Sequence, residues 1–386
     1  MDGYVHPGFA DVAQVFRRQL RRTDGGAAVA VYHRGQLVAD LWGGQRSAGD
    51  PWRADTLAMC FSSTKGIAST ALHLLADRGL IDYDAPVADC WPEFAQAGKD
   101  RCTVRHVLTH AAGLHAARSL IDHSERMLDW DYMADALACA TPAYTPGTRH
   151  GYHALTYGWL VGEIVRRVDG RDIATFVAEE ISAPLKLDGL HIGCPPEQRD
   201  RVAHIAPMAR PLMRLVDPRK GGLADRFTSL SATNRVLDAL APRGVEDVLW
   251  RTEAMDAAIP AANGFVTARS LAKMYAMLAG SGQVDGHRLL SPATVAKVGT
   301  VHARERDAVL GIRMGWRLGY HKAFTTRGAP RTAFGHFGFG GSGGWCDPSR
   351  ELAVAMVCSR GSGTPVGDAR IAYLGTAASA SAARAA

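Results

Sequence analysis

The sequence has no closely spaced pair of cysteines. Its seven cysteines are an odd number, stand alone along the chain and include no C-x-x-C pair. Disulfide scaffolds and zinc modules are recognised by even sets of cysteines at short, regular spacings. The pattern therefore argues against both classes, and it indicates a reducing compartment.

Long apolar runs are missing as well. The chain contains no stretch of 18 or more apolar residues, so no membrane-spanning helix is predicted. Residues 1–7 lack the basic start and the apolar run of a signal peptide. We therefore expect a cytoplasmic protein.

Blocks of like charge are also absent. The formal net charge is +6, but basic and acidic residues are scattered and no Lys/Arg run is interleaved with aromatic residues. This favours an ordinary solvated surface over a nucleic-acid-binding one. No pattern in the sequence predicts a cofactor or a metal ion, and the oligomeric state is left open.

The composition that remains is globular. The chain has 386 residues, of which 47% are hydrophobic and 21% charged, enough for a large core. An amphipathic helix is predicted over residues 8–22, and a hairpin follows over 27–33 and 36–42 around Arg34-Gly35. Further strands are predicted over 314–320, 332–336 and 352–358, and a last helix over 368–374 before a fraying Ala/Ser tail at 376–386.

The region between these strands is predicted to be mostly helical. Helices are expected over residues 104–109, 131–140, 155–168, 173–181, 234–240, 268–278 and 291–298, and a long loop over 207–230 that overhangs a site. Strands at both ends with helices between them predict one sheet built from the two termini. We expect a discontinuous sheet subdomain (1–85 and 251–386) and a helical subdomain (86–250), with the active site at their interface.

Ser62-Ser63-Thr64-Lys65 is the most informative motif. At helical spacing, Ser62 and Lys65 lie on one face about one turn apart. A serine becomes a good nucleophile when a base takes its proton, and a lysine accepts a proton only when burial has lowered its pKa. The apolar segment that follows, residues 66–76, predicts that burial. Ser62 is therefore a candidate nucleophile and Lys65 a candidate base.

Three other motifs are weaker candidates. Ser270 and Lys273 repeat the S-x-x-K spacing, but helical periodicity directs Lys273 away from the apolar face and into solvent. Ser342 lies in a G-x-S-x-G sequence that lacks the strand-turn-helix context of a lipase nucleophile, so we interpret it as a flexible loop residue. His106 and His110 have i,i+4 spacing without a third ligand, and structural histidines are expected.

Two further signatures follow Ser62 in a meaningful order. Tyr152 precedes an apolar helix about 90 residues later, and His336-Phe337-Gly338 lies in a Gly-rich turn near the C-terminus. This order resembles the serine β-lactamase and penicillin-binding-protein family, most closely family VIII carboxylesterases and class C β-lactamases. The resemblance covers roughly residues 8–375. It implies an α/β (α+β) β-lactamase/DD-peptidase fold, in which helices flank an antiparallel sheet and a mostly helical subdomain is added.

The resemblance also implies roles for single residues. Ser62 would be acylated, while Lys65 and Tyr152 would share the base and acid work. The backbone N–H groups of Ser62 and Phe339 would form the oxyanion hole. His336 would take the place of the lysine or histidine of the third family motif, beside Tyr152.

The sequence departs from the family at two positions. Ala154 ends the motif Tyr152-His153-Ala154, where the family usually has Asn or Ser, and Phe337 stands where the family usually has Thr or Ser. Less is then left to hold the amide and carboxylate of a β-lactam. We expect Phe337, Phe339 and Trp345 to form an apolar pocket, and we assign substrate binding to His336, Phe337, Gly338 and Trp345.

The sequence therefore predicts a serine carboxylesterase that hydrolyses small carboxylic esters through an acyl-enzyme on Ser62. A β-lactamase, a D-amino-acid peptidase or an acyltransferase of the same fold remains an alternative. A non-enzymatic scaffold is disfavoured because Ser62, Lys65 and Tyr152 are all intact.

Overall fold

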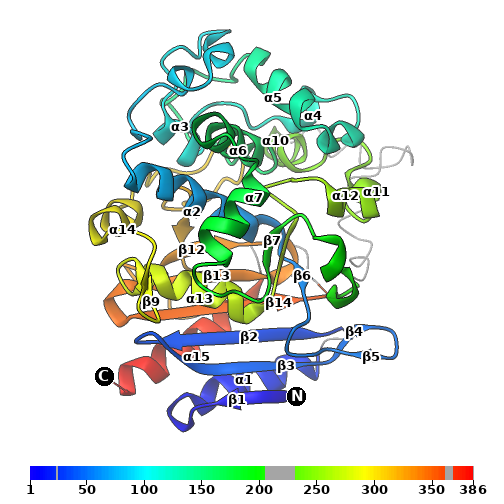
Figure 1. The fold of residues 1–386 in the computed structure, drawn as a ribbon, viewed down its shortest axis with the longest axis vertical. Coiled ribbons are helices and arrows are strands. Elements are labelled where there is room, and N and C mark those ends of the chain that lie inside the picture. Colours follow the sequence, from blue (N-terminus) through cyan, green and yellow to red (C-terminus); the bar gives the residue numbers. More distant parts are fainter. Residues whose placement is uncertain (23–24, 205–230, 361–367, 386) are drawn as a thin grey trace.

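A seven-stranded antiparallel sheet lies in the lower half of the computed structural model, which describes residues 1–22, 25–204, 231–360 and 368–385 (Figure 1). Strands from both ends of the chain lie side by side in it, and β2 pairs with β14 over their full length. The prediction of one sheet built from the two termini is confirmed. In spatial order, the strands are β1 (Asp2–Val5), β3 (Gln36–Gly43), β2 (Ala27–His33), β14 (Leu352–Cys358), β13 (Gly343–Asp347), β12 (Phe334–Phe337) and β11 (His321–Lys322).

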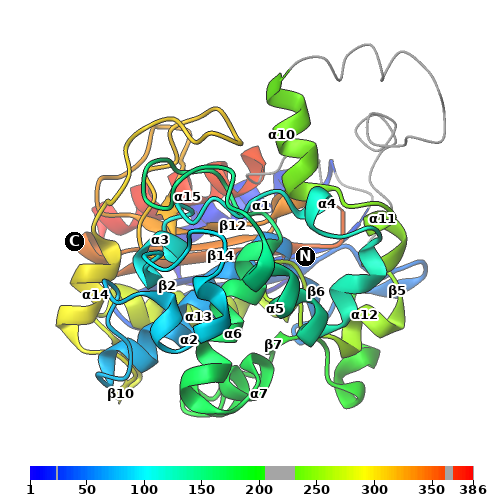
Figure 2. The same ribbon diagram turned by 90° about the horizontal axis from the view of Figure 1, so that it is seen from above.

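Helices cover both faces of this sheet (Figures 1 and 2). The alternation of residues along β2 separates the faces, since Val29 and Val31 belong to one hydrophobic cluster and Ala28 and Ala30 to another. The valine face packs against α1 (Ala10–Leu20) and α15 (Ala369–Arg384). The small side chains of the alanine face allow α13 (Ala268–Ala279) to approach the sheet closely.

The C-terminal tail is helical, and the prediction that it frays is wrong. α15 extends to Arg384, and Ala378, Ser381 and Ala382 are buried in it. Alanine has the highest helix propensity, and its small side chain lets α15 pack closely on α1. Arg384 adds an ion pair with Asp11 of α1 at 2.6 Å.

The predicted strand over residues 314–320 is also wrong. Gly315 and Gly319 have φ angles of 61° and 77°, and the N–H of Arg317 donates to the carbonyl of Tyr320 at 2.8 Å, which closes a tight turn. The strand begins only at His321. The strand predicted over 332–336 is β12, shifted by one to two residues.

β13 was not predicted, because glycine is depleted in strands. Glycine is required here all the same. A Cβ on Gly344 would lie 2.5 Å from the ring of Tyr275, which belongs to α13. The close approach of α13 to the sheet therefore explains the Gly-rich sequence.

Most helices above the sheet begin and end within a few residues of their predicted bounds. α2 (Thr64–Asp77) is central to the layer and is buried along most of its length. The predicted loop over residues 207–230 lies outside the described residues. The predicted helices are α3 (Val104–Leu108), α5 (Trp130–Cys139), α6 (Thr156–Asp169), α7 (Ile173–Val177), α10 (Ser231–Leu240), α13 and α14 (Pro292–Gly299).

The middle of the chain also contributes to a second, three-stranded sheet that the sequence did not indicate. Its strands are too short for a periodic pattern, and β7 pairs with β8 of the C-terminal part. The subdomain boundaries at residues 85 and 251 remain a prediction. The small sheet has the order β6 (Ala58–Met59), β8 (Gly264–Val266) and β7 (Leu190–Ile192).

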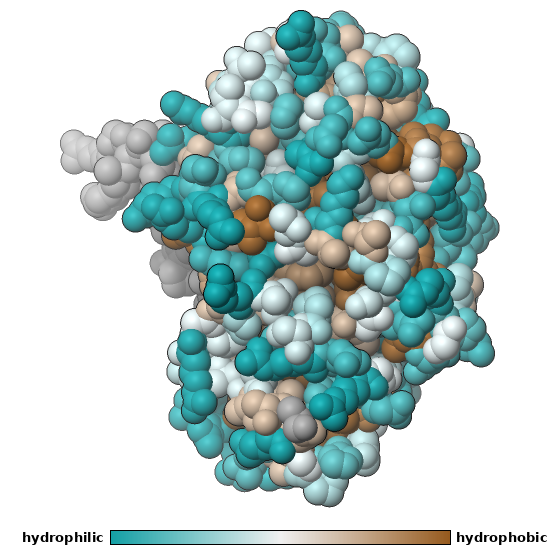
Figure 3. Space-filling model, turned by 90° about the vertical axis from the view of Figure 1, so that its left-hand side faces the viewer, coloured by the Kyte–Doolittle hydropathy of each residue, from teal (hydrophilic) through white to brown (hydrophobic). Residues whose placement is uncertain are grey.

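The remaining elements are short and lie at the periphery. They are β4 (Gln45–Ser47), β5 (Asp50–Pro51), β9 (Gln283–Val284), β10 (His287–Arg288), α4 (Ala117–Leu120), α11 (Val245–Val248) and α12 (Thr252–Asp256). Hydrophilic side chains cover most of the face in Figure 3, and apolar ones appear there in separate smaller areas. Within the described ranges, no helix combines the length and the apolar character needed to cross a bilayer.

Candidate active site

Ser62 lies in the 3-10 turn Phe61–Ser63 that leads directly into α2. Phe61, just before it, has a φ of 47°, an unfavourable conformation for a bulky residue. Two contacts hold the turn in place: Ser63 Oγ donates to the carbonyl of His336 at 3.3 Å, and Thr64 Oγ1 accepts from the N–H of Gly264 at 2.8 Å. Ser62 is thus positioned by β12 and β8 together.

Lys65 lies one turn further along α2 and is completely buried. Its Nζ is 3.0 Å from Ser62 Oγ and 2.9 Å from the carbonyl of Ala261. Burial lowers the pKa of Lys65 well below the usual value for lysine, and no carboxylate of the described residues contacts the amine to offset the desolvation. The amine is therefore suited to accept a proton from Ser62, as the spacing predicts.

Tyr152 comes from the segment before α6, and its ring lies beside Lys65, with Nζ 5.0 Å from the ring centroid. Its hydroxyl is buried and has no well-formed hydrogen bond to another described residue. Burial raises the pKa of Tyr152, while the nearby Ser62 hydroxyl partly opposes the rise. The phenol therefore carries its proton at neutral pH.

His336 is on β12, not in the turn where the sequence suggested it. Its ring stacks at 6.2 Å from that of Tyr152, and its Nδ1 is 3.0 Å from the carbonyl of Phe337. Burial, with His321 and Lys65 nearby, lowers the pKa of His336 well below its usual value. The imidazole is therefore neutral, and its Nε2 has no partner in the described part of the chain.

Two backbone N–H groups, on the neighbouring turns Phe61–Ser63 and Phe339–Gly341, were predicted to form the oxyanion hole. The N–H groups of Ser62 and Phe339 donate to no acceptor within the described residues. Gly338 lets the two segments approach closely, because a Cβ at this position would lie 2.2 Å from the carbonyl of Cys60 and 3.2 Å from Ser63 Oγ. Its own N–H is occupied by the carbonyl of Ser342 at 2.7 Å. The structure thus indicates a packing role for Gly338, where we had expected substrate binding.

We expect Gly338→Ala to lower the free energy of unfolding by about 1–3 kcal/mol, the usual effect of overpacking a tight contact. The φ of Gly338 is −100°, so the loss would come from the Cβ clash and not from backbone strain. Urea unfolding measures it. Gly8→Ala is the control, since its Cβ meets only the exposed His6 ring; equal, small losses in both variants would contradict the packing role.

Phe337 and Trp345 are not brought to the site. Both belong to the cluster between the sheet and α15, on the face opposite α13. Strand alternation explains this: His336 faces Tyr152, so Phe337 faces the other way. The prediction that these two side chains line an apolar pocket is corrected accordingly.

A different set of aromatic side chains clusters around Phe61, which belongs to the Ser62 turn. Phe61 packs edge-to-face on Phe339 at 5.8 Å and on Trp250 at 6.0 Å, and Trp250 is 40% exposed. We call these three residues the aromatic rim; Phe61 directly precedes Ser62 in the chain, Phe339 carries the second backbone N–H, and Trp250 contacts Phe61. Phe61 and Trp250 were missed because they are far apart in the sequence and no local pattern connects them.

The weaker candidates have structural roles. Ser270 Oγ donates to Asp188 at 2.7 Å at the start of α13, and Lys273 is not solvated as predicted but pairs with Asp285 at 2.7 Å. Ser342 precedes strand β13 and not a helix, and it is buried, so it is no flexible loop residue. Ser270 and Lys273 are thus held in structural contacts of α13.

The two histidines of the i,i+4 pair also serve the fold. His106 forms a capping box with Thr103 at the start of α3. His110 Nδ1 accepts the N–H of His153 at 3.1 Å. No group of three or more metal-ligating side chains lies together in the part of the chain that the structure describes.

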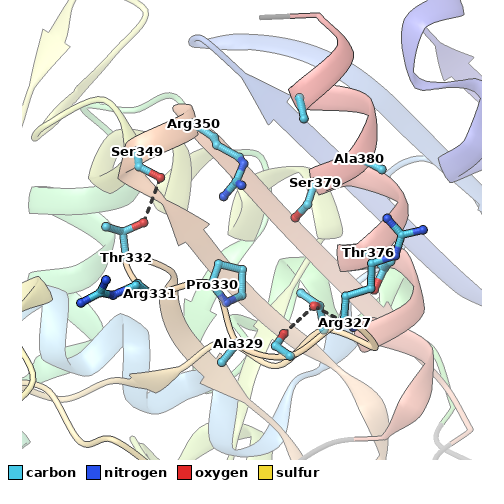
Figure 4. A pocket seen from close by; sticks show the side chains of 13 residues that line it. Arg327, Ala329, Pro330, Arg331, Thr332, Ser349, Arg350, Thr376, Ser379 and Ala380 are labelled. Atoms are coloured by element: carbon cyan, nitrogen blue, oxygen red, sulfur yellow. Dashed lines mark hydrogen bonds between the residues drawn. The ribbon is translucent and has the colours of Figure 1, made fainter.

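One surface cavity of about 550 Å³ lies away from this site. It opens between the turn before β12 and α15, where Arg327, Arg331 and Arg350 are part of its lining (Figure 4). Arg350 is paired with Asp347 at 2.6 Å. With no nucleophile-base pair in its lining, the cavity does not compete with the Ser62 site for the chemistry.

Comparisons with known proteins point to one family. The family model described as Beta-lactamase matches residues 12–378. The esterase/beta-lactamase LipL of Mycobacterium tuberculosis is 40% identical over 93% of this chain and 82% of its own. A family VIII carboxylesterase structure superposes with a TM-score of 0.86 at 34% identity, covering 98% of this chain and 99% of its own.

A penicillin-binding-protein homologue from Caulobacter crescentus is equally similar, with a TM-score of 0.85 and 35% identity over 98% of this chain and 99% of its own. The fold predicted from the three motifs is thus confirmed. The chain belongs to the β-lactamase family and is a serine hydrolase.

Proposed function

We propose that this protein is a carboxylesterase that hydrolyses small, apolar esters through an acyl-enzyme on Ser62. The observation that carries the proposal is the contact of 3.0 Å between Ser62 Oγ and the buried amine of Lys65. A neutral amine at this distance is within reach of the hydroxyl proton. Tyr152 supplies the acid, and two backbone N–H groups without an acceptor among the described residues, those of Ser62 and Phe339, supply the oxyanion site.

In the acylation step, Ser62 Oγ attacks the ester carbonyl while its proton moves to Lys65 Nζ. The N–H groups of Ser62 and Phe339 stabilise the oxyanion of the tetrahedral intermediate. Tyr152 gives its proton to the departing alkoxide, and the alcohol leaves. Lys65 is then an ammonium and Tyr152 a phenolate, and the pair titrates as a coupled unit.

Deacylation reverses these transfers. A water molecule attacks the acyl carbonyl while Tyr152 takes one of its protons, and the same two N–H groups stabilise the second tetrahedral intermediate. Lys65 returns its proton to Ser62 Oγ as the bond to the acyl group breaks. The products are a carboxylic acid and the enzyme in its starting protonation state.

The preference for apolar esters is supported by the surroundings of Ser62. The aromatic rim of Phe61, Phe339 and Trp250 offers apolar contact next to the nucleophile. Ala154 supplies no side-chain hydrogen bond, and Phe337 faces α15. The names of LipL and of the family VIII structure also support an esterase.

A β-lactamase is the second candidate, because the name of LipL includes this activity and the acyl-enzyme chemistry is shared. A β-lactam, however, brings a carboxylate and an amide into the site. Leaving each of these groups without a partner costs about 1–3 kcal/mol, so two losses amount to roughly two to four orders of magnitude in kcat/KM.

We therefore expect p-nitrophenyl butyrate to be hydrolysed with a kcat/KM at least about 100-fold above that for a chromogenic cephalosporin. Steady-state assays of both substrates on the same preparation measure the ratio, with Ser62→Ala as the blank. A cephalosporin kcat/KM equal to or above that of the ester would establish the second candidate instead.

A further inference from the structure

Tyr152 is held by an unusually complete set of contacts, and one buried carboxylate outside the predicted machinery is central to it. Asp307 Oδ1 accepts the backbone N–H of Tyr152 at 3.1 Å. Asp307 Oδ2 accepts the indole N–H of Trp316 at 3.0 Å. The ring of Trp316 stacks on that of Tyr152, with centroids 5.7 Å apart and planes inclined by 11°.

We propose that Asp307 is a positioning residue for Tyr152, whose carboxylate fixes both the Tyr152 backbone and the Trp316 ring stacked on the phenol. The inference rests on the proposed function, because the placement of Tyr152 matters only if its hydroxyl transfers protons. Neither Asp307 nor Trp316 was indicated by the sequence, since their contacts with Tyr152 span more than 150 residues.

Asp307 is itself rigidly held. Its Oδ1 also accepts the N–H groups of Val309 and Leu310, both at 2.9 Å, and its backbone N–H donates to the carbonyl of Ile312 at 2.9 Å. Every donor that reaches the carboxylate from the described residues is an N–H group, so the ionised form satisfies each of these contacts. Burial raises the pKa of Asp307 above its usual value, and these N–H groups oppose that rise. A proton on Oδ2 would instead face the N–H of Trp316. The carboxylate is thus a fixed anchor on which Tyr152 depends.

The neighbouring backbone is fixed by a different element. The N–H of Gly151 donates to the carbonyl of His110 at 2.8 Å, and that of His153 to His110 Nδ1 at 3.1 Å. Of the backbone N–H groups of residues 151–153, that of Tyr152 alone donates to Asp307. A change at Asp307 should therefore release Tyr152 without unfolding the segment around it.

The charge of Asp307 also affects the site. Among the described residues, the ionisable groups close to Tyr152 include Lys65 from α2, His110 after α3, Tyr157 from α6, His336 from β12 and Asp307 itself. A negative charge favours the protonated form of its neighbours, and Asp307 raises the pKa of Tyr152 in this way. Removing that charge moves the acid side of the pH profile, which reports the coupled Lys65–Tyr152 pair, to lower pH.

Asp307→Asn tests the proposal with p-nitrophenyl butyrate as substrate. We expect kcat to fall between about tenfold and a hundredfold, the effect of a displaced catalytic group, while KM stays within about twofold. The acid limb of kcat should shift to lower pH. Asp347→Asn is the matched control, since Asp347 is also buried and accepts from Thr332 and Ser349 at the far end of β13, and it should leave kcat and the limb unchanged.

A rescue variant separates positioning from general damage. In Asp307→Asn, the side-chain amide presents a donor to the indole N–H of Trp316. Trp316→Phe removes the indole N–H and keeps an aromatic ring on Tyr152. We expect the double variant Asp307→Asn/Trp316→Phe to be at least as active as Asp307→Asn, with losses that are not multiplicative.

Several results would overturn the inference. A folded Asp307→Asn with wild-type kcat and an unmoved acid limb contradicts it, and so do fully multiplicative losses in the double variant. Should Asp307→Asn fail to fold, Trp316→Leu takes over the test, and a wild-type kcat in that variant contradicts the positioning role. A wild-type protein that hydrolyses no ester contradicts the proposed function instead, so the two failures are distinguishable.

Discussion

Ser62→Ala is expected to lower kcat for p-nitrophenyl butyrate by roughly four to six orders of magnitude, the usual effect of removing the nucleophile from a catalytic unit. The reason is positional. Ser62 Oγ is the hydroxyl in contact with Lys65 Nζ, at 3.0 Å, and its backbone N–H has no acceptor among the described residues. The loss is measured in kcat under saturating substrate, because binding of the substrate to the aromatic rim does not require the Ser62 hydroxyl.

Two matched serines provide the controls. Ser270→Ala repeats the change in the other S-x-x-K motif, and Ser342→Ala in the G-x-S-x-G sequence. Both serines are buried, with Ser270 hydrogen-bonded to Asp188 and Ser342 next to Cys358, so each variant is expected to lose stability but keep most of its kcat. A folded Ser342→Ala without activity, beside an active Ser62→Ala, would contradict the assignment of the nucleophile.

Lys65→Arg is expected to be nearly as damaging as Lys65→Ala, with kcat reduced by about three orders of magnitude or more in both, within the range for loss of a general base. A guanidinium keeps its charge at every accessible pH and cannot accept the Ser62 proton. It is also larger than the ammonium, in a site that is fully buried and contacts the carbonyl of Ala261. Retention of more than a few per cent of wild-type kcat in Lys65→Arg would exclude Lys65 as the base.

The pH dependence follows from the direction of the pKa shift. Burial lowers the pKa of Lys65, so the amine is neutral, and able to accept a proton, at pH values where free lysine is an ammonium. Activity is therefore present at neutral pH and is lost as the pH falls through the apparent pKa of the Lys65–Tyr152 pair. An acid limb near the pKa of free lysine would contradict this mechanism.

Local contacts of the site could be predicted from the sequence, because they depend on helical spacing alone. Ser62 and Lys65 lie in contact because three residues on a helix span nearly one turn. The apolar composition of α2 predicts that Lys65 is buried. Tyr152 and His336 were placed beside them from the order of motifs and the family resemblance. No helix or strand periodicity relates Ser62 to Tyr152 or His336, which lie about 90 and about 270 positions further along the chain.

The failures have a common physical origin in tertiary contacts. Phe337 and Trp345 were assigned to the pocket from composition, but the pleat of β12 and β13 turns both toward α15. The aromatic rim and the contacts of Asp307 were missed because they join segments distant in sequence. The C-terminal helix was underestimated because the sequence alone does not show that the small alanines of α15 pack on α1.

The central claim, an acyl-enzyme on Ser62, is tested most directly by covalent trapping. A p-nitrophenyl alkylphosphonate reacts as an ester does, but its adduct on a serine is not readily hydrolysed. We expect intact-mass spectrometry to show one adduct per chain, and peptide mapping to place it on Ser62, with little labelling in Lys65→Ala. An adduct on Ser342 or Ser270, or full turnover of the ester by a protein that forms no adduct, would contradict the account.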